Sequence, residues 1–240
     1  MNNCVYFILL SALFLEDFVS NFVQVMIHVF LTSTETTSLR SILKDCMAFD
    51  VKNSRDHRRV HMFSILLNTF GHNIAAALSL CLWAGAFQTA SLLIHNIDTL
   101  DINLTFYLEL DQLVEYLERP LFRHLHLLLL QHDESRTQEG SSVMLYRVLK
   151  SILMAMPQST SYMILKERLT SVSRFYLNIK PQRIDTLTVT PFTRTFVDSL
   201  FEIRTLHCDI KWRTIRASSL EPLMTLCSDA EYAAEVSEES

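Results

Sequence analysis

"LKSILMAMPQSTSYMILKERL", residues Leu149–Leu169, decides how this chain is built, because it joins two apolar helical patterns through a sharp corner. Pro157 lacks a backbone N–H and disfavours helical geometry at Met156, so the first helix has to end there. A side-chain oxygen from Ser159, Thr160 or Ser161 then caps the next helix. The stretch therefore predicts a structural corner between two helices rather than a binding or catalytic site.

The corner also predicts which side chains meet across the pair. Helical spacing points to Leu149, Ile152, Leu153 and Met156 from the first helix, and Met163, Ile164 and Leu169 from the second. Helices joined by short turns pack antiparallel, and successive pairs bury their apolar faces by stacking on one another. With no legible repeat period, the expected fold is all-α: an irregular HEAT-like helical solenoid, with a long C-terminal helix after a linker.

Glycine usage supports an all-helical chain, since the 240 residues contain only three glycines. Tight hairpins and phosphate-binding loops need glycines in clusters, and none exists here. The clearest amphipathic helix precedes Pro120, and its stripe is Ile102, Phe106, Leu110, Leu113 and Leu117. The polar side chains opposite, which we expect to form a solvated face, are Glu109, Asp111, Gln112, Glu115 and Glu118.

Two apolar segments, 4–31 and 75–94, raise a membrane alternative. The run Cys4–Leu15 has no basic residue before it and is too short to span a bilayer, so it predicts a buried helix. From Ala12 to Leu31 the apolar residues follow helical spacing, at Phe14, Phe18, Phe22, Val25, Val29 and Phe30. The second segment has polar residues and a break near Gly85, which predict two short buried helices. An integral or peripheral membrane helical protein is the alternative interpretation.

Charge and composition argue against several functions. The net charge of −5 disfavours nucleic-acid binding. The five cysteines are scattered and odd in number, which is typical of buried reduced thiols; they are Cys4, Cys46, Cys81, Cys208 and Cys227. His57 and His61 share a helical face, yet the neighbouring arginines repel a cation. We therefore expect no metal, no cofactor and no enzymatic activity.

The C-terminal third differs from the helical body at 1–172. Residues 173–191 are polar and read as a linker, and 218–240 form an acidic tail expected to be disordered. Between them, 192–217 predicts one amphipathic helix. Such a helix usually docks on a partner or on a second copy, here through Phe196, Leu200, Ile203 and Ile210.

Four segments, in order, resemble the C-terminal domain of the ArPIKfyve family, the vacuole-morphology ("Vac fourteen") scaffolds. They read "VFLTSTETTSLRSILK", "HNIAAALSLCLWAGAFQTASLLI", "LELDQLVEYLERPLFRHLHLLLL" and "LYRVLKSILMAMPQSTSYMILKERL". The resemblance implies a non-catalytic scaffold of the complex that makes and removes phosphatidylinositol 3,5-bisphosphate. It implies binding of a Sac-type phosphoinositide phosphatase, assembly with the FYVE-type phosphatidylinositol 3-phosphate 5-kinase, and a homo-oligomer formed through the C-terminal helix.

The same resemblance implies a cytoplasmic protein held peripherally on late endosomal or vacuolar membranes. The phosphatase-binding surface is expected on 102–131 and 141–170. The residues predicted to bind the partner there are Leu113, Leu117, Phe122, Tyr146, Gln158 and Ser159. The first three are also expected to carry the packing between helices, and packing or capping explains the other three equally well.

Overall fold

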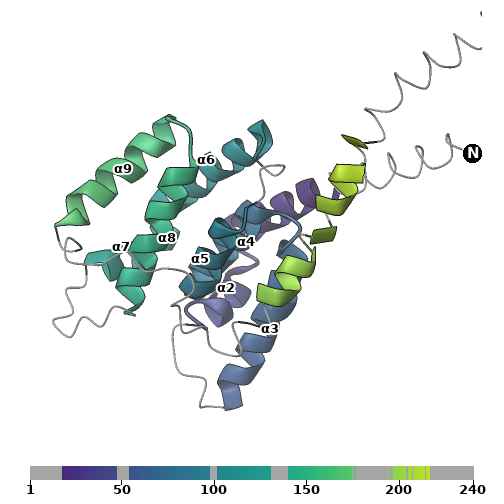
Figure 1. Ribbon diagram of the computed structural model, residues 1–240. Coiled ribbons are helices and arrows are strands. Elements are labelled where there is room, and N and C mark those ends of the chain that lie inside the picture. Colours follow the sequence, from purple (N-terminus) through teal and green to yellow (C-terminus); the bar gives the residue numbers. More distant parts are fainter. Residues whose placement is uncertain are drawn as a thin grey trace, which may run out of the picture.

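The computed structural model describes residues 18–47, 54–97, 102–130, 140–174 and 176, together with 194, 197–203, 205–206, 208–213 and 215–216 in the C-terminal part. Within these residues all regular secondary structure is helical and no strand occurs. Figure 1 shows the helices packed against one another in a stack. The all-α prediction is confirmed.

The first described helix covers 18–32. It is followed by α2 (Thr37–Leu43), α3 (Ser54–Phe70), α4 (Ile74–Ala84), α5 (Phe87–His95), α6 (Leu104–Glu118), the 3₁₀ turn η2 (Pro120–Phe122), α7 (Arg123–Leu130), α8 (Ser141–Ala155) and α9 (Thr160–Ser173). Successive helices pack in pairs, while α5 also contacts α8 and α6 contacts both α4 and α9. This pairwise stacking is the solenoid-like arrangement that the short turns predict.

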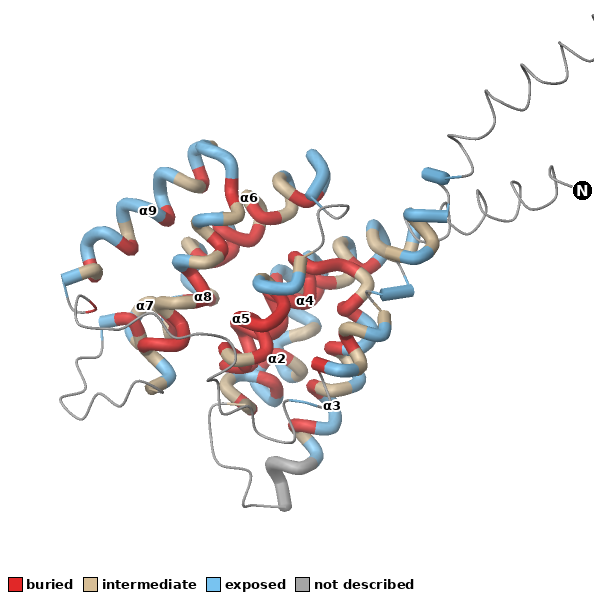
Figure 2. Tube along the Cα trace, in the orientation of Figure 1, coloured by how far each residue is buried: buried red, intermediate tan, exposed pale blue. Residues whose placement is uncertain are grey.

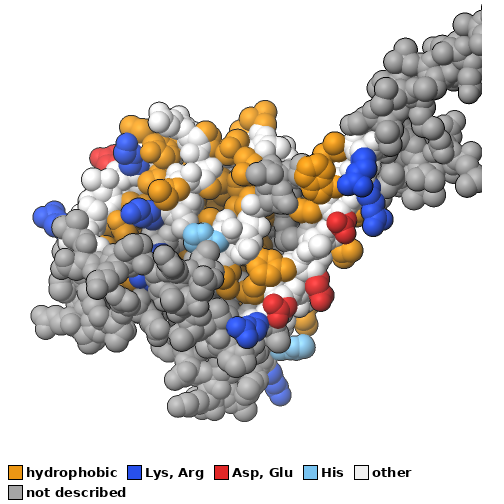
Figure 3. Space-filling view, viewed as in Figure 1, with side chains coloured by type: hydrophobic (Ala, Val, Ile, Leu, Met, Phe, Trp, Pro, Cys, Tyr) orange, Lys and Arg blue, Asp and Glu red, His pale blue; other side chains and the backbone are white. Residues whose placement is uncertain are grey.

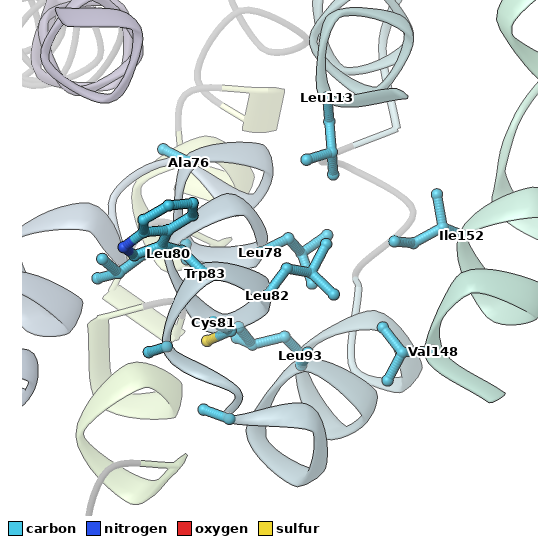
Figure 4. Close-up of a cluster of buried hydrophobic side chains, with 14 of the residues drawn as sticks. Ala76, Leu78, Leu80, Cys81, Leu82, Trp83, Leu93, Leu113, Val148 and Ile152 are labelled. Carbon is cyan, nitrogen blue, oxygen red and sulfur yellow. The ribbon is translucent and has the colours of Figure 1, made fainter. Parts of the chain in front are cut away.

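The centre of the stack is α4, all of whose residues are buried (Figure 2). Asn73 caps its first turn, and Gly85 ends it with a left-handed backbone (φ 75°), a conformation that glycine adopts without strain. Leu78 and Leu82 point towards Leu113 of α6 and towards α8 (Figure 4). The prediction of two short buried helices broken near Gly85 is confirmed. Among the described residues, no helix combines the length and apolarity that a bilayer span requires.

The α8–α9 corner forms as predicted, but with a different inner face. Met156 is extended (ψ 145°), and the Ser159 hydroxyl accepts the N–H of Tyr162. However, the buried residues of α9 are Ser161, Leu165, Leu169 and Val172. The prediction that Met163 and Ile164 pack inward is wrong, since their exposed fractions are 58% and 41%. Apolar residues occur around much of α9, so its spacing alone does not determine which side faces α8.

A buried arginine closes the turn between the first helix and α2. Arg40 donates to the carbonyls of Phe30 and Ser33, both at 2.7 Å, and to the hydroxyls of Thr36 and Thr37. Its own carbonyl accepts the indole N–H of Trp83 at 2.9 Å. The guanidinium thereby satisfies carbonyls that the end of the first helix leaves open. Sequence analysis did not identify Arg40 as the residue that closes this turn.

The C-terminal helix packs on the body of its own chain, beside α3 (Figure 1). Val197 and Leu200 are buried, and Leu200 lies against Gly71 after the end of α3. A Cβ atom at Gly71 would lie 2.6 Å from Cδ2 of Leu200, so glycine makes room for that side chain. Most of the predicted linker 173–191 and all of the predicted tail 218–240 lie outside the described residues.

Two of the five cysteines are buried free thiols, as predicted. Burial raises the pKa of Cys46 to about 12 and also raises that of Cys81. Protonated, buried thiols are poor nucleophiles and poor metal ligands. Cys208 is half-buried, whereas Cys4 and Cys227 lie outside the described residues.

Candidate partner-binding surface

Three helices, 18–32, α6 and α9, form one layer with α6 in the middle. On one side, Gln24 donates to Gln112 at 2.8 Å, and His28 hydrogen-bonds the hydroxyl of Tyr116. From the first contact to the second, the residue number rises by four on each of the two helices. The helix 18–32 therefore runs parallel to α6.

The opposite side of α6 is bonded to α9 in the same way. The hydroxyl of Ser159 donates to Asp111 at 2.7 Å, and Arg168 makes a two-pronged ion pair with Glu118. Ser159 thus has two partners, because it also caps α9. Such charge-assisted bonds set the position of α9 on α6 more closely than apolar contact does.

A third polar contact lies at the start of α4. The amide of Asn73, which is 2% exposed, donates to Glu109 at 2.8 Å and to Ser20 at 3.2 Å. Its oxygen accepts the N–H of Ala76. Burial raises the pKa of Glu109, while the hydrogen bond from Asn73 opposes that rise. One side chain therefore joins three helices.

These contacts correct the prediction of a solvated acidic face on α6. Glu109, Asp111, Gln112 and Glu118 are each bonded to another helix, and Glu115 alone of the five predicted polar residues is exposed. The spacing of these residues placed them correctly opposite the apolar stripe. It carried no information about helices packing on that side as well.

The outer surface of this layer carries exposed apolar side chains. Leu104 and Leu108 on α6 are 74% and 60% exposed, and Met163 and Ile164 project from the neighbouring α9. Together with Glu115 these residues define what we call the α6–α9 face. Figure 3 shows hydrophobic side chains gathered over the part of the molecule where Figure 1 places α6, α8 and α9. Exposed apolar side chains grouped on a rigid layer are typical of protein-binding surfaces.

Three of the six predicted partner-binding residues are core residues. Leu113, Leu117 and Phe122 are 1%, 4% and 0% exposed, so a partner cannot reach them in this fold. Their burial agrees with the packing role predicted for them, and it gives no support to direct contact with a partner. Their place is in the packing that holds the layer together.

The other three predicted residues differ from one another in burial and in their contacts. Tyr146 is half-buried and stacks on Tyr176, with ring centroids 4.3 Å apart, and burial raises its pKa. Gln158 is exposed beside Ser159, which is half-buried between Asp111 and Tyr162. Of these three residues, Gln158 alone has an exposed side chain.

The four residues predicted for self-association also differ in how far they are exposed. Leu200 is fully buried within its own chain, so its side chain presents no surface to a second copy in this fold. Ile203 and Ile210 are half-buried, and Phe196 lies outside the described residues. The exposed apolar side chains of this helix are instead Leu206, Trp212 and Ile215.

The described residues contain no group of three or more metal-binding side chains. One histidine–carboxylate pair is formed by His124 and Asp45, whose side chains are 3.9 Å apart. His124 packs edge-on to Trp83, and burial lowers its pKa despite the nearby carboxylate. This pair joins α7 to the segment after α2, which is a packing role.

Comparison with known proteins identifies the family of this chain. Residues 4–172 match the family model described as "Vacuolar protein 14 C-terminal Fig4p binding". The chain belongs to this family. The match includes every helix from 18–32 to the last turn of α9, and the C-terminal helix lies beyond it.

Named relatives agree with this assignment. The chain is 35% identical to the Protein VAC14 homolog of Arabidopsis thaliana over 160 residues, which is 66% of this chain and 20% of that protein. It is 28% identical to the Schizosaccharomyces pombe Protein VAC14 homolog over 153 residues, 64% of this chain and 17% of that protein. It is 26% identical to the Saccharomyces cerevisiae Vacuole morphology and inheritance protein 14 over 156 residues, 65% of this chain and 16% of that protein. The chain thus aligns with about a fifth of each relative, and no solved structure matches it.

Removing the Ser159 hydroxyl tests how the corner is held in this Vac14-family domain. Ser159→Ala deletes both the α9 cap and the bond to Asp111, so we expect unfolding free energy to fall by about 1–2 kcal/mol. Urea denaturation followed by circular dichroism measures the loss. Gln158→Ala, at the exposed neighbouring position, is the control and should change stability by less than about 0.5 kcal/mol. Equal effects at both positions would contradict this account.

Proposed function

We propose that this chain is a non-catalytic scaffold that binds a Sac-type phosphoinositide phosphatase in the phosphatidylinositol 3,5-bisphosphate pathway. One observation carries the proposal: a family model described by its binding of Fig4p matches 169 residues, 4–172, and these include the whole described solenoid. The stacked helices supply a rigid platform. Most of the polar side chains of α6 are engaged in holding that platform together.

The α6–α9 face is the surface that we propose for the phosphatase. Its apolar side chains are exposed on helices held together by the Ser159–Asp111 and Arg168–Glu118 contacts. A preorganised surface loses little conformational entropy on binding. Apolar residues near the centre of an interface usually carry most of its energy, so Leu108, which is 60% exposed, is the side chain to change.

A binding measurement with the Sac-type phosphatase of the same organism tests the proposal. We expect the full chain to bind it, and Leu108→Asp to weaken binding by about tenfold or more, because a charge would be buried in the interface. Isothermal titration calorimetry gives both dissociation constants. Ile65→Asp is the matched control, since Ile65 is 55% exposed on α3, outside the α6–α9 face.

Two different negative results are possible, one against the proposed surface and one against the scaffold proposal. Unchanged binding by Leu108→Asp, with the wild-type chain binding, would place the phosphatase on another surface. No binding by the wild-type chain at any concentration reached would remove the scaffold proposal itself. Circular dichroism of each variant shows whether the fold is retained.

The remaining parts of the proposal concern the larger assembly. We propose that the chain helps to bring the phosphatase together with the FYVE-type lipid kinase at late endosomal or vacuolar membranes, attached only peripherally, and forms homo-oligomers through its C-terminal helix. Exposed Leu206, Trp212 and Ile215 support the last point, since they leave an apolar surface on that helix after Leu200 has docked on its own body.

A further inference from the structure

The helix 18–32 is apolar on two opposite sides. The side that packs into the core carries Val23, Ile27, Phe30 and Leu31. The opposite side, which we call the outer stripe, carries four apolar residues that are 46–60% exposed: Phe18, Phe22, Val25 and Val29. The rings of Phe18 and Phe22 stack on each other, with centroids 6.3 Å apart.

The outer stripe continues the α6–α9 face onto a third helix. Helix 18–32 and α6 lie side by side and bury their inner sides in the same core, so their outer sides form one surface. Both hydrogen bonds between the two helices join residues that are 88 apart in sequence. The same offset places Phe18 and Phe22 at the height of positions 106 and 110. The stacked rings are therefore level with the exposed Leu108 of α6.

Helix 18–32 adds apolar area to this surface without adding charge. Between Phe18 and Thr32 the sequence has no Asp, Glu, Lys or Arg. Amphipathic helices that bind anionic membranes carry Lys or Arg beside their apolar face, and this helix has neither. Its composition therefore favours a protein over a lipid surface as the occupant.

The charge beside this apolar area is negative. The charged residues of α6 are all acidic, namely Glu109, Asp111, Glu115 and Glu118. Arg168 neutralises Glu118, whereas Glu115 is exposed about two turns beyond Leu108. The exposed Lys166 and Glu167 of α9 offset each other. Because a second copy would bring like charges together, charge complementarity favours a different partner with basic side chains.

We propose that the phosphatase docks across helix 18–32 and α6 through an apolar helix flanked by Lys or Arg side chains. Its apolar side chains cover Phe18, Phe22 and Leu108, and a basic side chain pairs with Glu115. This inference rests on the proposed function and extends its surface by one helix. The family match supports it, because the matched residues 4–172 include helix 18–32.

Calorimetric titration of the full chain with the Sac-type phosphatase of the same organism tests the apolar contact. Phe22→Ala should weaken binding by about tenfold, because aromatic side chains buried at an interface often carry much of its energy. Ile65→Ala is the matched control, since Ile65 on α3 and Phe22 are both 55% exposed. If both variants bind like the parent while Leu108→Asp binds weakly, helix 18–32 lies outside the interface. That result overturns this inference and leaves the proposed function standing.

Charge reversal tests the basic flank of the partner. Glu115→Lys should weaken binding by about tenfold at low salt, and the loss should shrink as sodium chloride is added, because salt screens the lost attraction. Glu202→Lys is the control, since Glu202 is exposed on the C-terminal helix. Equal effects of the two changes, or tighter binding by Glu115→Lys, would overturn the proposed basic flank.

Two measurements on the chain alone test the other occupants. If Phe22→Ala converts a dimer into monomers in sedimentation velocity, yet leaves phosphatase binding unchanged, the occupant is a second copy. If Phe22→Ala abolishes flotation with phosphatidylserine vesicles, again with phosphatase binding unchanged, the occupant is lipid. Either result overturns the inference. Absence of phosphatase binding by the parent chain would instead remove the proposed function and this inference together.

Discussion

Phe122→Ala is expected to lower the free energy of unfolding by about 3–5 kcal/mol, the usual cost of deleting a fully buried phenylalanine side chain. Phe122 is 0% exposed and meets the edge of Trp83 with ring centroids 5.4 Å apart. It also stacks beside His124. The loss would open a cavity where η2 joins α6 to α7, and urea denaturation followed at 222 nm measures it.

Two further variants make this prediction specific. Phe122→Leu keeps most of the volume and should cost less than half as much. Leu127→Ala, at a position that is 56% exposed on α7, should change stability by less than about 0.5 kcal/mol. If Phe122→Ala were as stable as the parent and yet lost phosphatase binding, Phe122 would be a contact residue after all, as the sequence suggested.

Asn73→Ala is expected to lower the free energy of unfolding by about 2–4 kcal/mol, through two separate effects. Loss of the α4 cap contributes about 1 kcal/mol. The rest arises because the half-buried carboxylate of Glu109 loses its donor, and a charged group removed from water without a hydrogen-bond partner is costly. Asn103→Ala is the matched control, since Asn103 caps α6 in the same way from an exposed position. The difference between the two variants measures the contribution of Glu109.

The cost of Asn73→Ala should depend on pH. Burial raises the pKa of Glu109 above its ordinary value of 4.5, so ionised Glu109 opposes folding at neutral pH. Asn73 offsets part of this opposition. Because a protonated Glu109 needs that donor less, the difference between Asn73→Ala and the parent should be largest near pH 7–8 and shrink as pH falls towards the raised pKa. A difference that is constant from pH 8 to pH 5 would show that the cap alone matters.

Several features of the fold follow from local patterns. Pro157 and Ser159 specify the corner between α8 and α9, and Gly85 specifies the break between α4 and α5. These effects act over a few residues, through a missing N–H, a side-chain cap or a left-handed backbone angle. They are therefore readable without knowing what packs on either helix.

The candidate surface was less predictable. Leu113, Leu117 and Phe122 were predicted both to bind the partner and to carry the packing between helices, and their burial agrees with the packing role. The exposed Leu104 and Leu108 lie on α6 outside the buried apolar stripe and were missed. The helical period does identify both. Leu104, Leu108, Asp111 and Glu115 follow one another at intervals of three or four residues, so all four lie on the same face of α6.

What the sequence determined by itself is the set of helices, their ends and the absence of clustered glycines that phosphate-binding or nucleophile loops need. Only the tertiary structure decided what those helices do to one another: which side of α9 faces inward, that Arg40 closes a turn, and that the polar side chains of α6 bond to helices on both sides. The physical reason is range. Caps, prolines and helical periods act between residues near in sequence. The side-chain partners of Asn73, Asp111 and Glu118 on other helices are instead 36–53 residues away and meet only when the stack forms.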